Sequence, residues 1–118
     1  MNSLHIKNVE IPNGETLWYR EAGQGNKVLV LLHGNRNSSI NWDVLIENLS
    51  PKEYKVYALD IRGFGRSTYN NPINTIRDLS EDLKLFADAL NIEKFVLIGW
   101  SAGGAVALQF AADYPDYV

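Results

Sequence analysis

Three short runs of consecutive apolar residues limit the folds that are open to this chain. The longest aliphatic run spans 28–32, and the others span 56–59 and 95–98. Runs of this kind are typical of strands that are buried on both faces of a parallel sheet. Because segments with helical patterns lie between and after them, the order predicts an α/β sheet with right-handed crossovers and loops at its carboxyl edge.

The residues before the first run predict an antiparallel strand pair. Segment 4–11 (LHIKNVEI) alternates roughly between apolar and polar residues, and 15–21 (ETLWYRE) is again rich in strand-forming residues. Pro12-Asn13-Gly14 between them favours a turn. The predicted fold class is therefore α/β, a mostly parallel sheet with an N-terminal antiparallel pair and helices on both faces.

Three segments carry helical patterns. The first is expected to be capped by Ser39 or Asn41 and to end at Pro51. The residues expected on its buried side are Trp42, Leu45, Ile46 and Leu49. The second follows Thr75 as cap, with apolar residues at Ile76, Leu79, Leu83, Phe86 and Leu90. The third follows Ser101 and is apolar on nearly all sides until Asp113, which predicts tight packing on the sheet, and Pro115 should stop it.

Composition excludes several classes of function. Eleven Lys and Arg against fourteen Asp and Glu give a net charge of −3, without the positive field that nucleic acid or anionic lipid requires. The chain has no cysteine, so disulfides, thiolate metal sites and a cysteine nucleophile are excluded. His5 and His33 lack carboxylates at ligand spacing, and we expect no metal site. Without a leader-like start or an apolar run near the roughly 20 residues of a membrane span, we expect a cytoplasmic protein.

Residues 99–103 (GWSAG) match the G-x-S-x-G motif of a nucleophile elbow, between a buried strand and an apolar helix as the motif requires. The sharp turn strains the serine backbone and exposes its hydroxyl, so its neighbours must lack bulk. Gly99, Gly103 and Gly104 supply that clearance. Ser101 also precedes a helix N-terminus, where free N–H groups favour an oxyanion. The alternative interpretation is an inert serine in a glycine-rich packing turn.

Two further loops follow strands in the same order. His33-Gly34-Asn35 follows the first buried run, and 60–67 reads D-x-R-G-x-G-x-S after the second. With these two loops and the nucleophile elbow in this order, the whole chain resembles the α/β-hydrolase fold family. The resemblance implies that Ser101 is the nucleophile and that the backbone N–H groups of Asn35 and Ala102 form the oxyanion hole.

The resemblance also implies a structural role for other residues of these loops, without a part in catalysis. The loop-shaping residues are His33, Gly34, Asp60 and Arg62, beside the glycines of the elbow. A role of His33 as general base is the alternative to a structural histidine. In this family the triad acid and histidine follow the nucleophile. No histidine follows Ser101, and Asp113 and Asp116 occupy the end of the last helix and the turn after it.

We therefore expect 1–118 to be the N-terminal part of a single α/β-hydrolase domain, nearly inert alone, with the cap and the remaining triad residues in an absent C-terminal part. The predicted function is a serine hydrolase that cleaves a small carboxylic ester or related acyl substrate through an acyl-enzyme, without a cofactor. A serine nucleophile argues against the epoxide hydrolase and haloalkane dehalogenase branches, whose nucleophile is a carboxylate.

Two alternatives from other classes remain. One is a non-catalytic binding module that keeps the fold. The other, a nucleotide-binding domain, is disfavoured because GFGRST has Thr68 where the third glycine of the fingerprint belongs. Cut after Val118, the strand at 95–98 becomes an edge, so the expected partner besides substrate is the missing half or a second copy of the chain.

Overall fold

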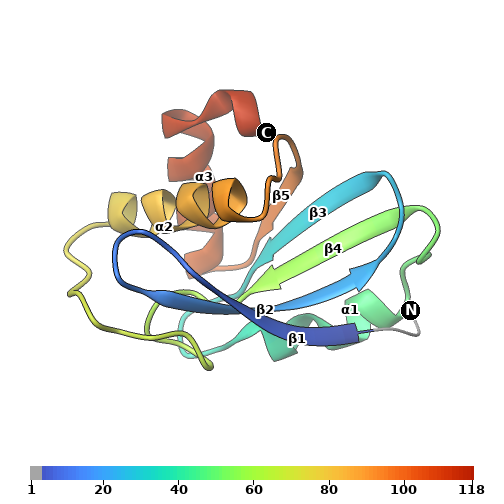
Figure 1. Ribbon diagram of the computed structural model, residues 1–118, viewed down its shortest axis with the longest axis horizontal. Coiled ribbons are helices and arrows are strands. Elements are labelled where there is room, and N and C mark those ends of the chain that lie inside the picture. The colour runs from blue at the N-terminus through green and yellow to red at the C-terminus, as the bar shows by residue number, and fades with distance from the viewer. Residues whose placement is uncertain (1–3) are drawn as a thin grey trace.

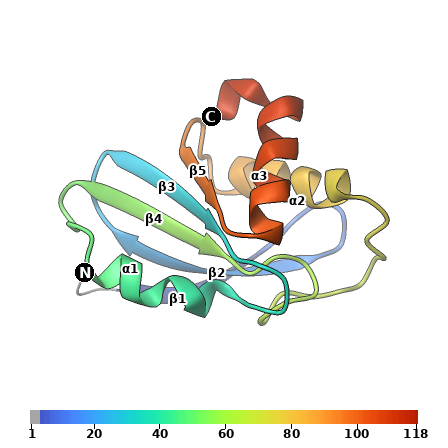
Figure 2. The same cartoon turned by 180° about the vertical axis from the view of Figure 1, so that it is seen from behind.

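Residues 4–118, the part of the chain that the computed structural model describes, form one five-stranded sheet with helices on both faces (Figures 1 and 2). The elements in chain order are β1 (Leu4–Glu10), β2 (Thr16–Gly23), β3 (Lys27–Leu32), the 3₁₀ helix η1 (Ser39–Trp42), α1 (Asp43–Glu47), β4 (Tyr54–Leu59), α2 (Ile76–Ala89), β5 (Val96–Gly99), α3 (Ala102–Asp113) and the 3₁₀ turn η2 (Pro115–Tyr117). Each predicted strand is present, with ends that differ by one or two residues.

The strand order is β1-β2-β4-β3-β5. β3 runs parallel to both β4 and β5, whereas β2 pairs antiparallel with β1 and with β4. The turn between β1 and β2 is closed by a hydrogen bond from the Gly14 N–H to the Ile11 carbonyl at 3.1 Å. The predicted mostly parallel sheet with an antiparallel N-terminal pair is therefore confirmed.

β3 is buried on both faces because its side chains enter two separate cores. Val30 and Leu32 belong to the core under α2 and α3, whereas Leu29 and Leu31 belong to the core on the other side, under η1 and α1. Figure 2 shows the second layer, with α1 across the sheet from α2 and α3. The uninterrupted aliphatic run follows from this two-sided burial.

The first helical segment differs from its prediction. It divides into η1 and α1, it begins after Ser38, and it ends at Glu47, before Pro51. Ser38 has the extended backbone of an N-cap, so neither Ser39 nor Asn41 caps the segment. Ile46 is fully buried, but the Leu45 residue is 39% exposed. Trp42 and Leu49 pack against the same core as Ile46, so three of the four predicted inward-facing residues reach it.

The other two helices begin and end close to the predicted residues. α2 follows Thr75, whose N–H donates to the Asp78 carboxylate at 3.0 Å. α3 ends before Pro115, but it does not pack on all sides, because Leu108 is 77% exposed. None of the helices in 4–118 combines the length and apolarity needed to cross a membrane.

β5 lies at the open edge of the described sheet. It pairs only with β3, and Val96 and Ile98 are 56% and 37% exposed. The segment after α3 returns to the start of this strand, where the Phe95 N–H donates to the Tyr117 carbonyl at 2.8 Å. Val96 and Ile98 lie beside Leu29 and Leu31, so the exposed apolar side chains of this edge are on the α1 face of the sheet.

Candidate active site

The carboxyl ends of β3, β4 and β5 meet at one edge of the sheet, because the three strands are parallel. The loops that leave this edge are 33–38, 60–75 and the turn at Trp100 and Ser101. These are the three loops that the sequence singled out. Candidate functional residues from distant parts of the chain therefore gather there.

Ser101 occupies a strained turn between β5 and α3. Its backbone has φ 57° and ψ −120°, and the residue is exposed. The turn is closed by the Gly103 N–H to the Trp100 carbonyl at 3.0 Å and by the Gly104 N–H to the Ser101 carbonyl at 2.8 Å. A left-handed φ at a residue with a Cβ costs on the order of 1–3 kcal/mol, so the surrounding structure must hold it. This is the strand-turn-helix geometry of a nucleophile elbow.

Two of the three elbow glycines are required by close approach. A Cβ at Gly99 would lie 2.3 Å from the Gly103 carbonyl oxygen, and a Cβ at Gly103 would lie 2.4 Å from the Leu32 carbonyl oxygen. At Gly104 the nearest atom would be 3.6 Å away, an ordinary van der Waals contact. The elbow therefore has no room for side chains at Gly99 and Gly103, whereas Gly104 is not needed for clearance.

The loop after β3 lies directly against the elbow. A Cβ at Gly34 would stand 3.2 Å from the Ser101 Cβ. The Gly34 carbonyl accepts the Asn37 N–H at 3.2 Å, which makes a four-residue turn with Asn35 and Arg36 at its corner. Among the described residues, the N–H groups of Asn35 and Ala102 donate to no acceptor. Two unused backbone donors thus flank the contact between Gly34 and Ser101.

His33 is completely buried, and both of its ring nitrogens are occupied. Nε2 accepts the Ile61 N–H at 3.0 Å, so the ring proton resides on Nδ1, which donates to the Gly34 carbonyl at 2.7 Å. Burial lowers the pKa of His33, which keeps the imidazole neutral. Its ring packs edge-on against Phe64 with centroids 5.5 Å apart. The geometry fits a loop-shaping residue and leaves no nitrogen for a general base.

Asp60 joins two of the three loops. Its Oδ1 accepts the Ser39 N–H at 2.7 Å, and its Oδ2 accepts the Arg66 N–H at 3.2 Å. The side chain is buried beneath both segments. Its carboxylate therefore holds the backbone of both segments in place.

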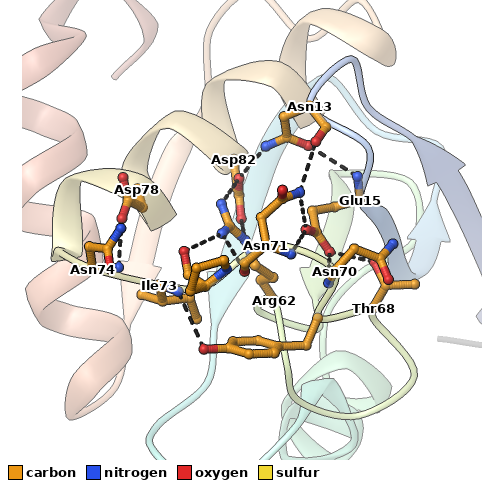
Figure 3. A network of polar contacts seen from close by, with 12 residues as sticks. Asn13, Glu15, Arg62, Thr68, Asn70, Asn71, Ile73, Asn74, Asp78 and Asp82 are labelled. Atoms are coloured by element: carbon orange, nitrogen blue, oxygen red, sulfur yellow. Dashed lines mark hydrogen bonds and ion pairs between the residues drawn. The ribbon is translucent and has the colours of Figure 1, made fainter.

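Arg62 anchors the loop after β4 to α2 (Figure 3). Its Nε and Nη2 donate to the two carboxylate oxygens of Asp82, each at 2.8 Å, and Nη1 donates to the Asn71 carbonyl at 3.0 Å. Both side chains of the ion pair are buried. The hydrogen bond to Asp82 raises the pKa of Arg62, so the guanidinium stays charged. Arg62 is thus committed to the loop and is not free for substrate.

Glu15 is a buried carboxylate that the sequence reasoning missed. It accepts hydrogen bonds from the Thr68 hydroxyl at 2.6 Å, from the Asn70 N–H at 3.0 Å and from the Asn71 N–H at 2.8 Å (Figure 3). Burial alone would raise the pKa of Glu15, but these hydrogen bonds lower it to about 2. A glutamate after an Asn-Gly turn carries no local sign of this role, because its partners lie more than fifty residues away. No group of three or more His, Asp or Glu in 4–118 is arranged to hold a metal ion.

Known proteins share both sequence and structure with this chain. A family model described as alpha/beta hydrolase fold matches residues 27–118. The human serine hydrolase BPHL is 34% identical over 110 residues, which cover 90% of this chain and 38% of that protein.

Two solved structures show the same fold. A membrane phospholipase A, a bacterial virulence factor, has a TM-score of 0.90 and 32% identity over 98% of this chain and 37% of its own. Epoxide hydrolase A from Mycobacterium thermoresistibile has a TM-score of 0.86 and 33% identity, over 98% of this chain and 37% of its own. The chain therefore spans less than two fifths of the length of each of these relatives.

Proposed function

The chain belongs to the α/β hydrolase family, and on that premise we propose that the full-length protein is a serine hydrolase that cleaves a carboxylic ester or related acyl substrate through an acyl-enzyme. The observation that carries the proposal is the conformation of Ser101, an exposed serine with φ 57° at the start of α3. Strain of this kind persists where the surrounding structure enforces it, and it clusters at active sites. The 34% identity to a human serine hydrolase supports the same conclusion.

In the proposed reaction, Ser101 Oγ attacks the substrate carbonyl carbon and its proton passes to a general base. The carbonyl oxygen becomes an oxyanion, which the N–H groups of Asn35 and Ala102 stabilise by hydrogen bonds. When the intermediate collapses, the alcohol leaves and Ser101 carries the acyl group as an ester. Water then hydrolyses that ester and restores the serine.

We place the general base and its acid partner outside 1–118. His33 has both nitrogens in use, and residues 102–118 contain no histidine. A serine hydroxyl without a base is a weak nucleophile. Residues 1–118 alone should therefore turn over esters at a negligible rate.

The similarity to an epoxide hydrolase favours a second candidate substrate, but the chemistry of Ser101 opposes it. If a serine opened an epoxide, the product would be an ether, which water does not hydrolyse under these conditions. An acyl group on the same oxygen is an ester, and it can be removed. Ser101 is thus suited to turnover of acyl substrates.

The experiment that tests the proposal is labelling of the full-length protein with a fluorophosphonate probe, followed by peptide mapping. We expect the label on Ser101, and we expect Ser101→Ala to abolish both labelling and hydrolysis of p-nitrophenyl esters. The matched control is Ser50→Ala, a change at an exposed residue in the turn before β4, which should retain both. Labelling of another serine, or ester hydrolysis without any label, would disprove the assignment. A folded protein with neither label nor turnover would favour the non-catalytic binding module.

A further inference from the structure

The five arginines of this chain divide into two groups. Three of them form ion pairs, namely Arg20 with Asp43, Arg62 with Asp82, and Arg77 with Asp113. The other two, Arg36 and Arg66, are exposed and form no ion pair with any residue in 4–118. Both lie on loops that leave the carboxyl edge of the sheet, the edge that also carries Ser101.

Arg36 is two residues from the glycine that contacts the elbow. Gly34 packs against Ser101, and the turn from Gly34 to Asn37 places Arg36 at its corner with φ 63°. That corner normally takes glycine or asparagine, because a Cβ is strained there. The chain thus holds a long cation at a position where the backbone favours a smaller residue.

Arg66 lies on the loop that follows β4. Its N–H donates to Asp60, whose other oxygen accepts the Ser39 N–H, so the two loops meet at one carboxylate. The Arg66 guanidinium lies over the Trp18 ring, 5.4 Å from its centroid. This aromatic contact restricts the side chain without neutralising it.

The exposed charge of the three loops at this edge is therefore positive, although the chain as a whole carries −3. Asp60 is the one carboxylate within 33–38, 60–71 and 99–104, and it is buried with both oxygens accepting backbone N–H groups. The charge of Arg62 is compensated by Asp82. Arg36 and Arg66 remain as the charges of these loops that no carboxylate in 4–118 compensates.

We propose that Arg36 binds an anionic group of the substrate, with Arg66 adding to the positive field at the same edge of the sheet, so that the acyl compound cleaved at Ser101 carries a carboxylate or a phosphate away from its scissile carbonyl. A guanidinium fork binds either oxyanion through two parallel hydrogen bonds. Uncompensated positive charge at a site entrance also attracts an anionic substrate and raises the rate of encounter. This inference rests on the proposed function for the identity of the scissile bond.

The first test measures binding alone, in the full-length Ser101→Ala variant. The calorimetric probes are dimethyl adipate, monomethyl adipate, and a methyl ester of similar length that ends in a phosphate. We expect at least one charged probe to bind on the order of 10-fold more tightly than the neutral diester, because hydrogen bonds between charged groups are the stronger class. The preferred charged probe identifies the oxyanion, and its advantage should shrink as salt is added.

Substitutions then assign the preference to the arginine. Arg36→Gln should remove most of the 10-fold advantage, Arg36→Lys should keep part of it, and the matched control Arg77→Gln should keep all of it. Equal binding of charged and neutral probes by the parent protein would overturn the inference. An advantage that survives both Arg36→Gln and Arg66→Gln would overturn it as well.

The second test uses the active protein with a neutral p-nitrophenyl ester and one that ends in a carboxylate or phosphate. Arg36→Gln should raise KM for the charged ester by on the order of 10-fold relative to KM for the neutral ester, since the arginine contacts a remote group. An unchanged KM with Ser101 still labelled would overturn the anion site but not the hydrolase. Charge-selective binding without any label on Ser101 would overturn the hydrolase but not the anion site.

Discussion

The Nε2 atom of His33 accepts the backbone N–H of Ile61 at 3.0 Å, which ties the loop after β3 to the loop after β4. The other ring nitrogen donates to the carbonyl of Gly34, the residue that packs against Ser101. A neutral, buried imidazole thus determines where the proposed oxyanion loop lies.

Replacing His33 with alanine should disturb both the loop and the fold. The change leaves the Ile61 N–H without an acceptor and opens a buried cavity, so we expect a loss of about 2–4 kcal/mol in the free energy of unfolding. Ester hydrolysis should fall with it. The matched control is His5→Ala, because His5 is exposed on β1. Denaturant unfolding and an esterase assay check the result, and equal behaviour of the two variants would contradict the role of His33.

Asn35 should act through its backbone and not through its side chain. Asn35→Ala keeps the N–H and should change turnover little. Asn35→Pro removes it and should reduce kcat by on the order of 100-fold. Proline suits the second position of a turn, so the fold should survive. Circular dichroism and esterase kinetics of the full-length variants check both statements. Full activity of Asn35→Pro would show that the Asn35 N–H is not part of the oxyanion hole.

Two adjacent glycines of α3 should respond in opposite ways to alanine. Gly103→Ala places a methyl group 2.4 Å from the Leu32 carbonyl oxygen, so it should destabilise the fold by roughly 2 kcal/mol or more. Gly104→Ala meets only ordinary contacts and should stabilise the helix by up to about 1 kcal/mol. Thermal unfolding of the pair distinguishes clearance from helix propensity. A similar loss of thermal stability in both variants would show that the turn tolerates a side chain at neither position.

Glu15 should make the fold sensitive to acid. Its pKa is lowered from 4.5 to about 2 in the folded chain, so its contribution is fully present above pH 4.5 and is lost as the pH falls towards 2. The full difference between the folded and unfolded pKa values of Glu15 corresponds to about 3 kcal/mol of unfolding free energy. Unfolding free energies measured between pH 2 and 6 should therefore decline less steeply for Glu15→Gln than for the parent protein. Glu10→Gln, at an exposed residue, should keep the parent slope.

The open edge at β5 should cause residues 1–118 to self-associate when produced alone. Val96 is 56% exposed on β5, whose edge away from β3 pairs with no other strand in 4–118, and this combination favours pairing with another chain. Val96→Lys should restore a monomer in size-exclusion chromatography, whereas Val44→Lys, on α1 across the sheet, should not. A downstream fragment supplied in trans should bind this edge and restore ester hydrolysis. A monomeric 1–118 that hydrolyses esters unaided would contradict both expectations.

Local patterns were sufficient for the strands, for the fold class and for the position of the elbow. The aliphatic run at 28–32 predicted a strand buried on both faces, because only such a strand needs apolar residues at every position. Thr75 marked the start of α2, and G-x-S-x-G between a strand and a helix marked Ser101. These features depend on backbone conformation and on periodicity within a few residues, and both are encoded locally.

Tertiary structure decided which distant groups meet. Glu15 and Asn71 are 56 positions apart, and their hydrogen bonds exist because β2 and the loop after β4 lie side by side. Apolar character showed that Leu108 could be buried, but only the packing shows that nothing in 4–118 covers it. The charge pattern likewise contains five arginines, and only the folded chain separates the three with carboxylate partners from Arg36 and Arg66. Burial and pairing are properties of neighbours in space, and local sequence does not specify those neighbours.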